Sequence, residues 1–214
     1  MGSMAFSLRA GPLAPRCGTL LAALLLVASG CSQQAKLAPL AADAVVLAFG
    51  DSLTFGTGAN DDESYPAQLA RLIGRRVVRE GVPGEVSAAG LARLPGVLAA
   101  HRPRLLLLCH GGNDFLHRQP KQQAADNVRA MIRLAKARGI DVVLIGTPEF
   151  GFTLTPPGFY ADIAKEFAVP YEGEVLGKIL RDSTLKSDQI HPNAKGYRLI
   201  ADRVLGVLRK AGAV

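Results

Sequence analysis

The 214-residue sequence has no tryptophan and only three cysteines. The lack of tryptophan argues against a carbohydrate-binding groove built on indole stacking. Cys17 and Cys31 lie in or beside an N-terminal leader segment, so Cys109 alone belongs to the folded part and no internal disulfide is expected. Cys109 ends the apolar run 105–108, and we expect it to be a buried strand residue instead of a reactive thiol.

Long apolar runs and blocks of like charge are also missing. The apolar stretch 20–27 is too short to cross a bilayer as a helix. Lysine and arginine number 25 against 18 aspartates and glutamates, but the basic residues are scattered, so we expect no nucleic-acid partner. Hydrophobic residues make up 49% of the chain, which excludes wholesale disorder, and the length suits one globular domain.

The N-terminal segment is typical of export. Arg9 and Arg16 precede the apolar stretch 20–27, as in a secretory signal peptide. Small residues then precede Cys31, which resembles the site where bacterial lipoproteins are cleaved and acylated. We therefore expect a lipoprotein-type signal peptide over 1–30, a linker over 31–42 and a periplasmic or outer-membrane-anchored product. Signal cleavage without acylation, giving a soluble periplasmic or secreted protein, is the alternative.

Apolar runs and amphipathic stretches alternate along the rest of the chain. The runs 44–49, 77–79, 105–109 and 142–145 are rich in Val, Leu and Ile, which is typical of strands buried on both faces. Helical patterns lie at 64–73, 91–100 and 121–138, and a last helix carries the apolar stripe Tyr197, Ile200, Ala201, Val204, Leu205 and Leu208. This order predicts an α/β protein over 43–214: a three-layer α/β/α sandwich with a mainly parallel, flavodoxin-like sheet, whose sites form at the carboxyl ends of the strands.

Two polar motifs follow the first two predicted strands. The segment GDSLTFG at 50–56 places Ser52 in an exposed turn, where its hydroxyl is a candidate nucleophile, although serine in such a turn often only caps a helix. Pro83 and Gly84 suit a type II turn, because proline presets its own φ and glycine accepts the positive φ that follows. That turn leaves the Gly84 amide free to stabilise an oxyanion, but a purely structural turn explains the pair equally well.

Two further motifs lie later in the chain. In GGND at 111–114, the glycines let the backbone turn sharply and bring the Asn113 carboxamide toward the same edge, although asparagine beside glycine is usually only a turn former. Asp188 lies three residues before His191, so its carboxylate can hold the imidazole Nδ1–H while Nε2 faces a nucleophile. The alternatives are an aspartate cap beside a loop histidine, or a metal ligand, but no zinc-like spacing recurs.

In this order, the four motifs resemble those of the SGNH (GDSL) hydrolase superfamily. The stretches GDSLTFGTGA, ESYPAQLARLIG, GEVSAAGLARLP, HGGNDFL and HPNAKGY are most similar to its bacterial arylesterase and acyl-CoA thioesterase/lysophospholipase branch. The resemblance implies that Ser52 is the nucleophile and that His191 is the general base, oriented by Asp188. It also implies an oxyanion hole made by the Ser52 and Gly84 amides and the Asn113 side chain.

Aromatic residues gather in the segment 147–160, after the fourth predicted strand. It holds four of the twelve aromatic residues of the chain: Phe150, Phe152, Phe159 and Tyr160. We expect them to form an apolar wall or lid of an acyl pocket, and the alternative is that a long loop simply packs on the core. An apolar pocket favours acyl or aryl esters over a bulky polysaccharide ester.

We therefore expect a monomeric serine esterase. Its substrates would be small-molecule or lipid esters, with thioesters and lysophospholipids included, and its only membrane contact would be a lipid anchor on Cys31. A carbohydrate or peptidoglycan O-acetylesterase is the alternative with the same chemistry, and it suits the same compartment. Glu80 stands where members of the resembled family often have asparagine, and Val86 where threonine is common, which leaves substrate preference open. A non-catalytic lipid-binding envelope lipoprotein would account for the leader but would leave the four motifs unexplained.

The expected mechanism uses neither a metal nor an organic cofactor, because a histidine base activates the serine hydroxyl. We predict that EDTA leaves the initial rate of ester hydrolysis unchanged. A loss of rate that added metal restores would instead assign Asp188 and His191 to a metal site.

Overall fold

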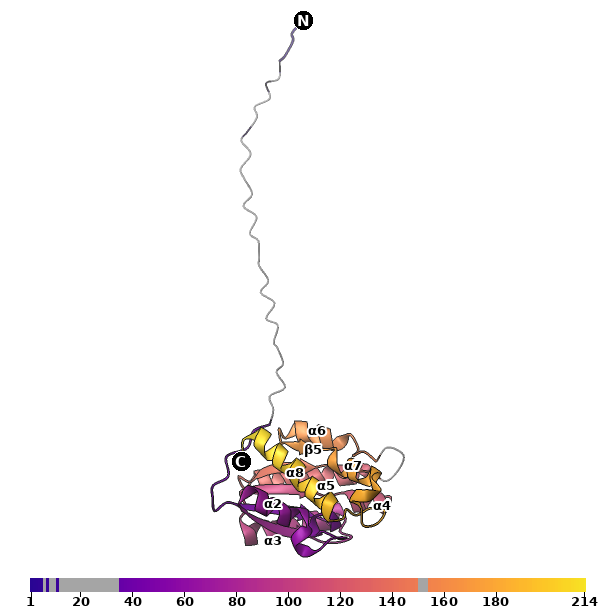
Figure 1. Ribbon diagram of the computed structural model, residues 1–214. Coiled ribbons are helices and arrows are strands. Elements are labelled where there is room, and N and C mark those ends of the chain that lie inside the picture. The colour runs from indigo at the N-terminus through magenta and orange to yellow at the C-terminus, as the bar shows by residue number, and fades with distance from the viewer. Residues whose placement is uncertain (6, 8–10, 12–34, 150–153) are drawn as a thin grey trace. The chain divides into compact units, whose positions relative to one another are not determined.

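A parallel β-sheet lies at the centre of the protein (Figure 1). The structure, a computed structural model, describes residues 1–5, 7, 11, 35–149 and 154–214, and its compact unit is Gln34–Val214. The strands are β1 (Val45–Gly50), β2 (Arg76–Gly81), β3 (Leu105–Cys109), β4 (Asp141–Ile145) and β5 (Tyr171–Glu172). The longer helices are α2 (Tyr65–Ile73), α3 (Ser87–His101), α5 (Lys121–Lys136), α6 (Phe159–Glu166), α7 (Val175–Arg181) and α8 (Ala194–Ala211). Short helical turns are α1 (Ser52–Phe55), η1 (Asp61–Glu63), α4 (Gly112–Leu116) and η2 (Ser183–Leu185).

The strand order is β2-β1-β3-β4-β5, which is flavodoxin-like and confirms the predicted fold class. All neighbouring strands are parallel, and Gly50 of β1 lies opposite both Gly81 of β2 and Cys109 of β3. Because the strands point the same way, their C-terminal ends share one edge of the sheet, the carboxyl edge, and their N-terminal ends share the opposite one, the amino edge. The chain leaves β1 toward β2 and then crosses to β3 on the other side, so the order switches beside β1, where such folds place their sites.

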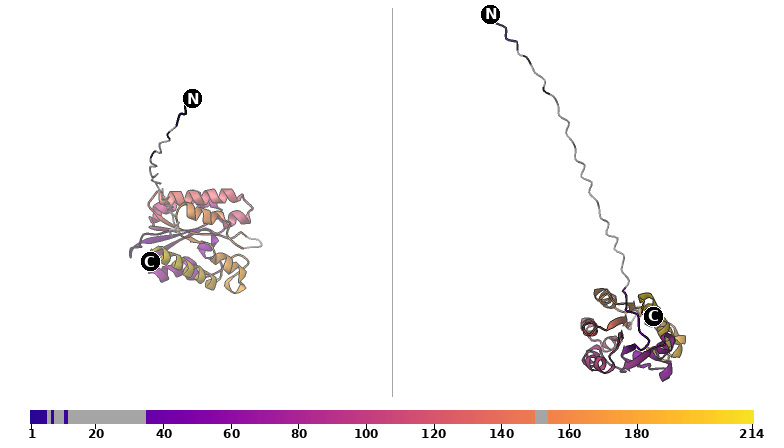
Figure 2. Two further views of the ribbon diagram at one scale, coloured as in Figure 1. Left: turned by 90° about the horizontal axis from the view of Figure 1, so that it is seen from above. Right: turned by 90° about the vertical axis from the view of Figure 1, so that its left-hand side faces the viewer.

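Alternate side chains of the strands enter two hydrophobic layers. On one face of the sheet, residues such as Val46 and Leu107 pack with helices α2, α7 and α8. On the other face, residues such as Leu47 and Leu108 pack with helices α3, α5 and α6. Figure 2 shows the sheet between these two helical layers. Cys109 is buried in the first layer, and burial raises the pKa of its thiol, which agrees with the structural role expected for it.

Residues 35–42 are attached to the folded unit, although the sequence predicted a linker over 31–42. The Leu37 and Leu40 N–H groups donate to the Ala211 and Ala213 carbonyls at the end of α8, at 3.0 and 2.9 Å. The Leu37 and Leu40 side chains also pack against the first hydrophobic layer. Residues 12–34, which include the apolar stretch of the leader and Cys31, lie outside the described residues. Among the residues that are described, no helix is long and apolar enough to cross a membrane.

Sequence patterns did not predict three elements of the second half, namely β5, α6 and α7. Strand β5 has two residues, too few for any pattern of alternation. Helices α6 and α7 have eight and seven residues, and α6 begins inside the segment expected to be a loop. Their places are set by packing on the sheet and not by local propensity.

Leu107 lies at the centre of the sheet and is fully buried. We predict that Leu107→Ala lowers the free energy of unfolding by about 2 to 5 kcal/mol, because it removes buried methyl groups and leaves a cavity. Urea unfolding would measure the loss. The same substitution at Leu116, which is 43% exposed, serves as the control and should cost much less. Equal losses for the two variants would contradict the assigned core.

Candidate active site

Ser52 begins α1 directly after β1. A Cβ on Gly50 would lie 2.1 Å from the Cys109 carbonyl oxygen, so only glycine lets β1 end this close to β3. The chain then turns at Asp51, whose carboxylate caps α1 by accepting the Leu53 N–H at 3.0 Å. This turn places Ser52, partly buried, at the carboxyl edge.

His191 and Asp188 lie on the loop that precedes α8. Asp188 Oδ1 accepts the backbone N–H groups of Ile190 and His191, both at 2.8 Å, and its Oδ2 lies 2.7 Å from His191 Nδ1. The Ser187 N–H donates to the His191 carbonyl at 3.0 Å and closes the loop. Asp188 therefore fixes both the backbone and the ring of His191.

The His191 ring faces Ser52, with Nε2 at 3.0 Å from Ser52 Oγ. With Nδ1–H donated to Asp188, Nε2 carries the lone pair and can accept the hydroxyl proton. Burial raises the pKa of Asp188, but hydrogen bonds from the His191 ring and two backbone N–H groups outweigh it and hold the pKa below its usual value. Asp188 therefore stays ionised beside the imidazole.

The turn 82–85 follows β2 at the same edge. It is closed by the Glu85 N–H, which donates to the Val82 carbonyl at 3.1 Å, and the φ of Gly84 is +77°, as the predicted type II turn requires. The Val82 N–H donates to the Gly50 carbonyl at 3.1 Å, which ties the turn to the end of β1. In the described part of the chain, the Gly84 amide has no hydrogen-bond partner and is free to donate.

Asn113 joins the loop after β1 to the turn after β2. Its Nδ2 donates to Asp51 Oδ2 at 3.3 Å and to the Glu85 carbonyl at 3.0 Å. Asn113 thus lies at the carboxyl edge as expected, but both of its N–H groups already have acceptors, which the sequence did not predict. Asp51 is buried, and burial raises the pKa of its carboxyl group although the Leu53 N–H donates to it.

Behind the turn, Glu85 belongs to a buried charge network that sequence reasoning missed. Arg93 donates to the Glu85 carboxylate from Nε at 2.9 Å and from Nη2 at 2.7 Å, and His110 Nε2 lies 3.1 Å from the same carboxylate. The fully buried His110 accepts the Gly111 N–H at Nδ1, at 3.2 Å, so its Nε2 carries the proton and donates to Glu85. Gly90 makes the necessary room, because a Cβ there would lie 2.2 Å from His110 Nε2.

This network holds Glu85 as a carboxylate. Burial raises the pKa of Glu85, but the hydrogen bonds from Arg93 and His110 and the positive charge of Arg93 outweigh burial and lower the pKa to about 2. Because the Glu85 backbone closes the Gly84 turn and accepts Asn113, the network also positions both of those groups. A glutamate after Pro-Gly and a lone histidine before Gly-Gly were visible in the sequence, but no local pattern connects residues 25 apart.

A small apolar pocket of about 30 Å³ adjoins the Ser52–His191 pair. Its lining residues are Leu53, Gly112, Thr147, Pro148, Leu176, Ile179, Leu180, Ile190 and Pro192. Leu53 follows the serine and two of the others flank the histidine, whereas helix α7 supplies the opposite wall. The volume admits about two water-sized groups, which suits a short acyl chain.

Phe159 and Tyr160 do not line this pocket, so the prediction that they form its wall is wrong. Tyr160 is fully buried, and its hydroxyl donates to the His110 carbonyl at 2.7 Å. Its ring stacks on that of Phe159 with the centroids 4.3 Å apart. Helix α6 begins at Phe159 and directs both rings into the second hydrophobic layer. Phe150 and Phe152 lie outside the described residues.

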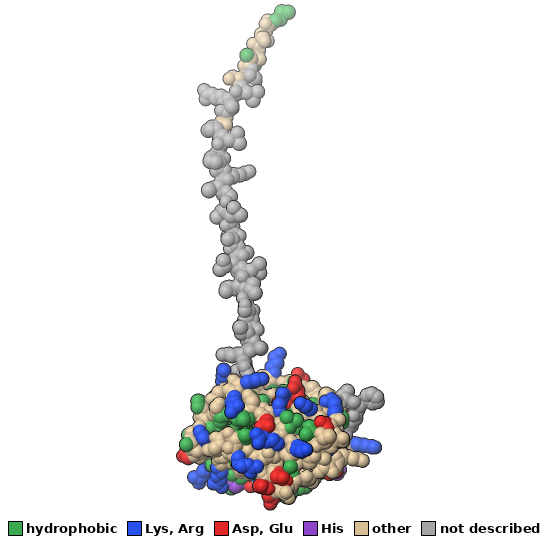
Figure 3. Space-filling view, viewed as in Figure 1, with side chains coloured by type: hydrophobic (Ala, Val, Ile, Leu, Met, Phe, Trp, Pro, Cys, Tyr) green, Lys and Arg blue, Asp and Glu red, His purple; other side chains and the backbone are tan. Residues whose placement is uncertain are grey.

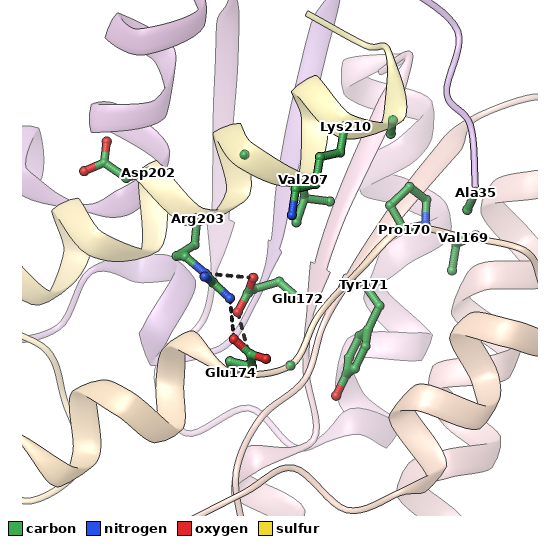
Figure 4. Close-up of a pocket in the computed structure, with 13 residues that line it drawn as sticks. Ala35, Val169, Pro170, Tyr171, Glu172, Glu174, Asp202, Arg203, Val207 and Lys210 are labelled. Carbon is green, nitrogen blue, oxygen red and sulfur yellow. Dashed lines mark hydrogen bonds and ion pairs between the residues drawn. The ribbon is translucent and has the colours of Figure 1, made fainter. Parts of the chain in front are cut away.

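A larger hollow of about 530 Å³ lies between β5 and α8 (Figure 4). Arg203 bridges Glu172 and Glu174 there, at 3.2 and 2.6 Å, and Glu172 also caps α7 by accepting the Val175 N–H at 2.8 Å. These charges hold α7 and α8 together, and the hollow contains none of the site residues expected from the sequence. Within the ranges that the structure describes, no cluster of three or more His, Cys, Asp or Glu side chains is placed to hold a metal.

Comparison with known proteins agrees with the fold and the geometry at the carboxyl edge. The model of the GDSL-like lipase/acylhydrolase family matches residues 48–199, and the chain belongs to that family. It is therefore a carboxylic ester hydrolase of the GDSL type.

Curated relatives span almost the whole chain. Esterase TesA of Pseudomonas aeruginosa is 32% identical over 197 residues, which cover 86% of this chain and 97% of the relative. Thioesterase 1/protease 1/lysophospholipase L1 of Escherichia coli is 33% identical over 170 residues, 76% of this chain and 82% of the relative.

Solved structures are similar as well. The crystal structure of TesA matches with a TM-score of 0.69 at 26% identity, over 78% of this chain and 99% of that one. AlinE4, described as an SGNH-hydrolase family esterase, matches with a TM-score of 0.61 at 27% identity, over 80% of this chain and 98% of that one.

The network around Glu85 generates a pH-dependent prediction. Because its pKa is lowered from 4.5 to about 2, ionised Glu85 stabilises the fold above pH 4.5, and that stabilisation is lost as the pH falls toward 2. We predict that Glu85→Gln lowers the free energy of unfolding near neutral pH and flattens its decline below pH 4.5, measured by urea unfolding at a series of pH values. The control Asp62→Asn removes an exposed carboxylate that makes no ion pair in the described residues, and it should keep the wild-type slope. An unchanged slope in Glu85→Gln would contradict the assignment.

Proposed function

We propose that the protein is a serine esterase that cleaves acyl or aryl esters through an acyl-enzyme on Ser52. The observation that supports this most strongly is the 3.0 Å contact between Ser52 Oγ and His191 Nε2, with Asp188 on the other ring nitrogen at 2.7 Å. A serine hydroxyl is a weak nucleophile by itself, and a base within hydrogen-bond reach is what activates it. Family membership supports the same reaction class.

In the proposed first step, His191 Nε2 takes the Ser52 proton as Oγ attacks the ester carbonyl carbon. The charge on the imidazolium is stabilised by the Asp188 carboxylate, which stays ionised. His191 then returns the proton to the leaving alcohol as the acyl-enzyme forms, and a water activated in the same way releases the acid.

The negative charge on the carbonyl oxygen requires donors already in place. The amides of Ser52 and Gly84 have no partners in the described residues and are the proposed donors. The Asn113 side chain is the third proposed donor, and it must release one of its two present acceptors in order to donate to the substrate oxygen. We expect it to release Asp51, because that hydrogen bond, at 3.3 Å, is longer and weaker than the 3.0 Å bond to the Glu85 carbonyl.

The pocket beside Ser52 supports a preference for short acyl groups, because its volume is about 30 Å³ and its wall is aliphatic. Because acetyl is a short acyl group, a carbohydrate or peptidoglycan O-acetylesterase is the second candidate function. We further propose that residues 1–30 export the chain and that Cys31 is acylated, as the sequence pattern indicates.

Hydrolysis of p-nitrophenyl acetate, butyrate, octanoate and palmitate by the wild type and by Ser52→Ala tests the proposal. We predict turnover by the wild type, highest for acetate or butyrate, and none above background for Ser52→Ala. Circular dichroism would establish that the variant is folded. A folded Ser52→Ala with wild-type turnover would refute the nucleophile, and a preference for palmitate would refute the short-chain assignment.

Asn113→Ala tests the oxyanion hole separately. We predict a loss of about 10² to 10³ in kcat with little change in KM, because the donor acts on charge that develops in the transition state. Asn127→Ala is a matched control, since that carboxamide donates to Ser87 Oγ away from the nucleophile. A kcat close to that of the wild type in folded Asn113→Ala would contradict the assigned role.

A further inference from the structure

The amino edge of the sheet, opposite the candidate active site, carries a group of exposed basic side chains that we name the basic edge. Its members are Lys36, Arg76, Arg102, Arg104, Arg209 and Lys210. Arg76 begins β2 and lies opposite Val45 of β1, and the Arg104 N–H donates to the Val45 carbonyl at 2.9 Å. These contacts bring basic residues that are distant in sequence to one edge.

Residues 35–42 run along the basic edge, from Arg209 and Lys210 at the end of α8 to Arg102 and Arg104. The Leu37 N–H donates to the Ala211 carbonyl, which brings Lys36 to the end of α8, where Arg209 and Lys210 lie. A hollow of about 360 Å³ on the same edge is lined by residues 38–41 together with Arg102 and Arg104. In Figure 3, Lys and Arg lie among Asp and Glu over the visible face and gather at its lower left.

The basic edge differs from the other basic regions of the described chain because six basic side chains without an ion pair gather on it. Elsewhere, Arg198, Arg203 and Arg93 are paired with Asp202, Glu172 and Glu85. Lys178 and Lys195 are exposed and, among the described residues, unpaired as well, but they belong to α7 and to the start of α8. Across residues 35–149 and 154–214, none of the six side chains of the basic edge makes an ion pair or a hydrogen bond. The nearby acidic residues that line the hollow are Asp43 and Asp141, so the edge keeps a net positive charge.

Helix dipoles explain only part of this arrangement. Arg209 and Lys210 lie in the last turn of α8 and Arg102 is the C-cap of α3, where positive charge is favourable. Lys36, Arg76 and Arg104 end no helix. Six unpaired cations on one edge also repel one another.

The path of the chain indicates what covers this edge. Ala35, the first residue described after Cys31, lies at the amino edge beside Ala211, and both line the hollow between β5 and α8. Ala35 is four residues beyond Cys31, a distance of at most about 14 Å in an extended chain. An acyl group on Cys31 would therefore hold the amino edge close to the bilayer surface, with the basic residues facing the lipid headgroups.

We propose that the basic edge is a docking surface for an anionic phospholipid bilayer, and that docking turns the carboxyl edge, with Ser52 and His191, away from the lipid. The surface uses only the folded unit and adds to any acyl anchor, because one acyl chain alone binds reversibly and a basic patch supplies a second attachment. Substrate then reaches Ser52 from the aqueous side. The proposal does not depend on the identity of the ester.

Vesicle binding by residues 34–214, which contain the whole sheet and both hydrophobic layers, tests the surface without the acyl group. The probe is co-sedimentation with vesicles of phosphatidylcholine alone or of an equimolar mixture with phosphatidylglycerol. We expect binding only to the anionic vesicles, and weaker binding as salt is raised. At about fivefold per basic residue, Arg102→Gln/Arg104→Gln should weaken binding about 25-fold and leave p-nitrophenyl acetate hydrolysis unchanged.

The matched control is Lys178→Gln/Lys195→Gln, which removes the same charge from exposed residues of α7 and the start of α8, far from the amino edge. We expect it to bind anionic vesicles like the wild type. A dye on Ala38→Cys should be quenched by a lipid-borne quencher, and a dye on Lys178→Cys should not. No binding to anionic vesicles, equal losses for the two double variants, or equal quenching at the two sites would overturn the proposal, whether or not the esterase assignment holds.

Discussion

The close approach of three backbone segments at Gly81, Gly50 and Cys109 is the constraint on which the candidate site depends. The three residues lie side by side across β2, β1 and β3. A Cβ on Gly50 would strike the Cys109 carbonyl, and one on Gly81 would lie 2.1 Å from the Phe55 nitrogen. Because Gly50 and Gly81 have no side chains, α1 packs directly on the ends of β1 and β2. The loops that carry the nucleophile, the Gly84 turn and Asn113 therefore start from positions that differ by no more than the spacing of neighbouring strands.

Buried charged side chains next to these three residues hold the loops of the candidate site in place. Asp51 joins its own turn to Asn113, and Glu85 is held by Arg93 and His110. These buried side chains have hydrogen-bond partners, so they are held in place without the cost of an unsatisfied donor or acceptor. They hold the Gly84 turn in position before charge develops on a substrate.

The sequence predicted the central strands, the last helix and the main residues of the candidate site, but not the contacts that support them. The central strands of Val, Leu and Ile and the stripe of α8 have clear periodicity, and the order of polar motifs at strand ends placed Ser52, Gly84, Asn113 and His191 at one edge. The contact between Glu85 and His110 was not predicted, because the two residues are distant in sequence and only the fold brings them together. The prediction that Tyr160 lines an acyl pocket was wrong for a related reason. The sequence shows that the segment is aromatic, but the direction of the rings depends on where α6 begins. The attachment of residues 35–42 depends on the end of α8, about 170 residues later, which no local pattern reports.

The separation of Ser52 and His191 by 139 residues sets when the enzyme can exist at all. A chain still being synthesised carries the serine long before the histidine, and an unfolded chain brings the two together only by chance. The Ser52–His191 pair therefore forms only when the loop before α8 has packed at the carboxyl edge. Under the proposed export in an unfolded form, the chain would stay inactive toward the esters of the compartment that makes it until it folds.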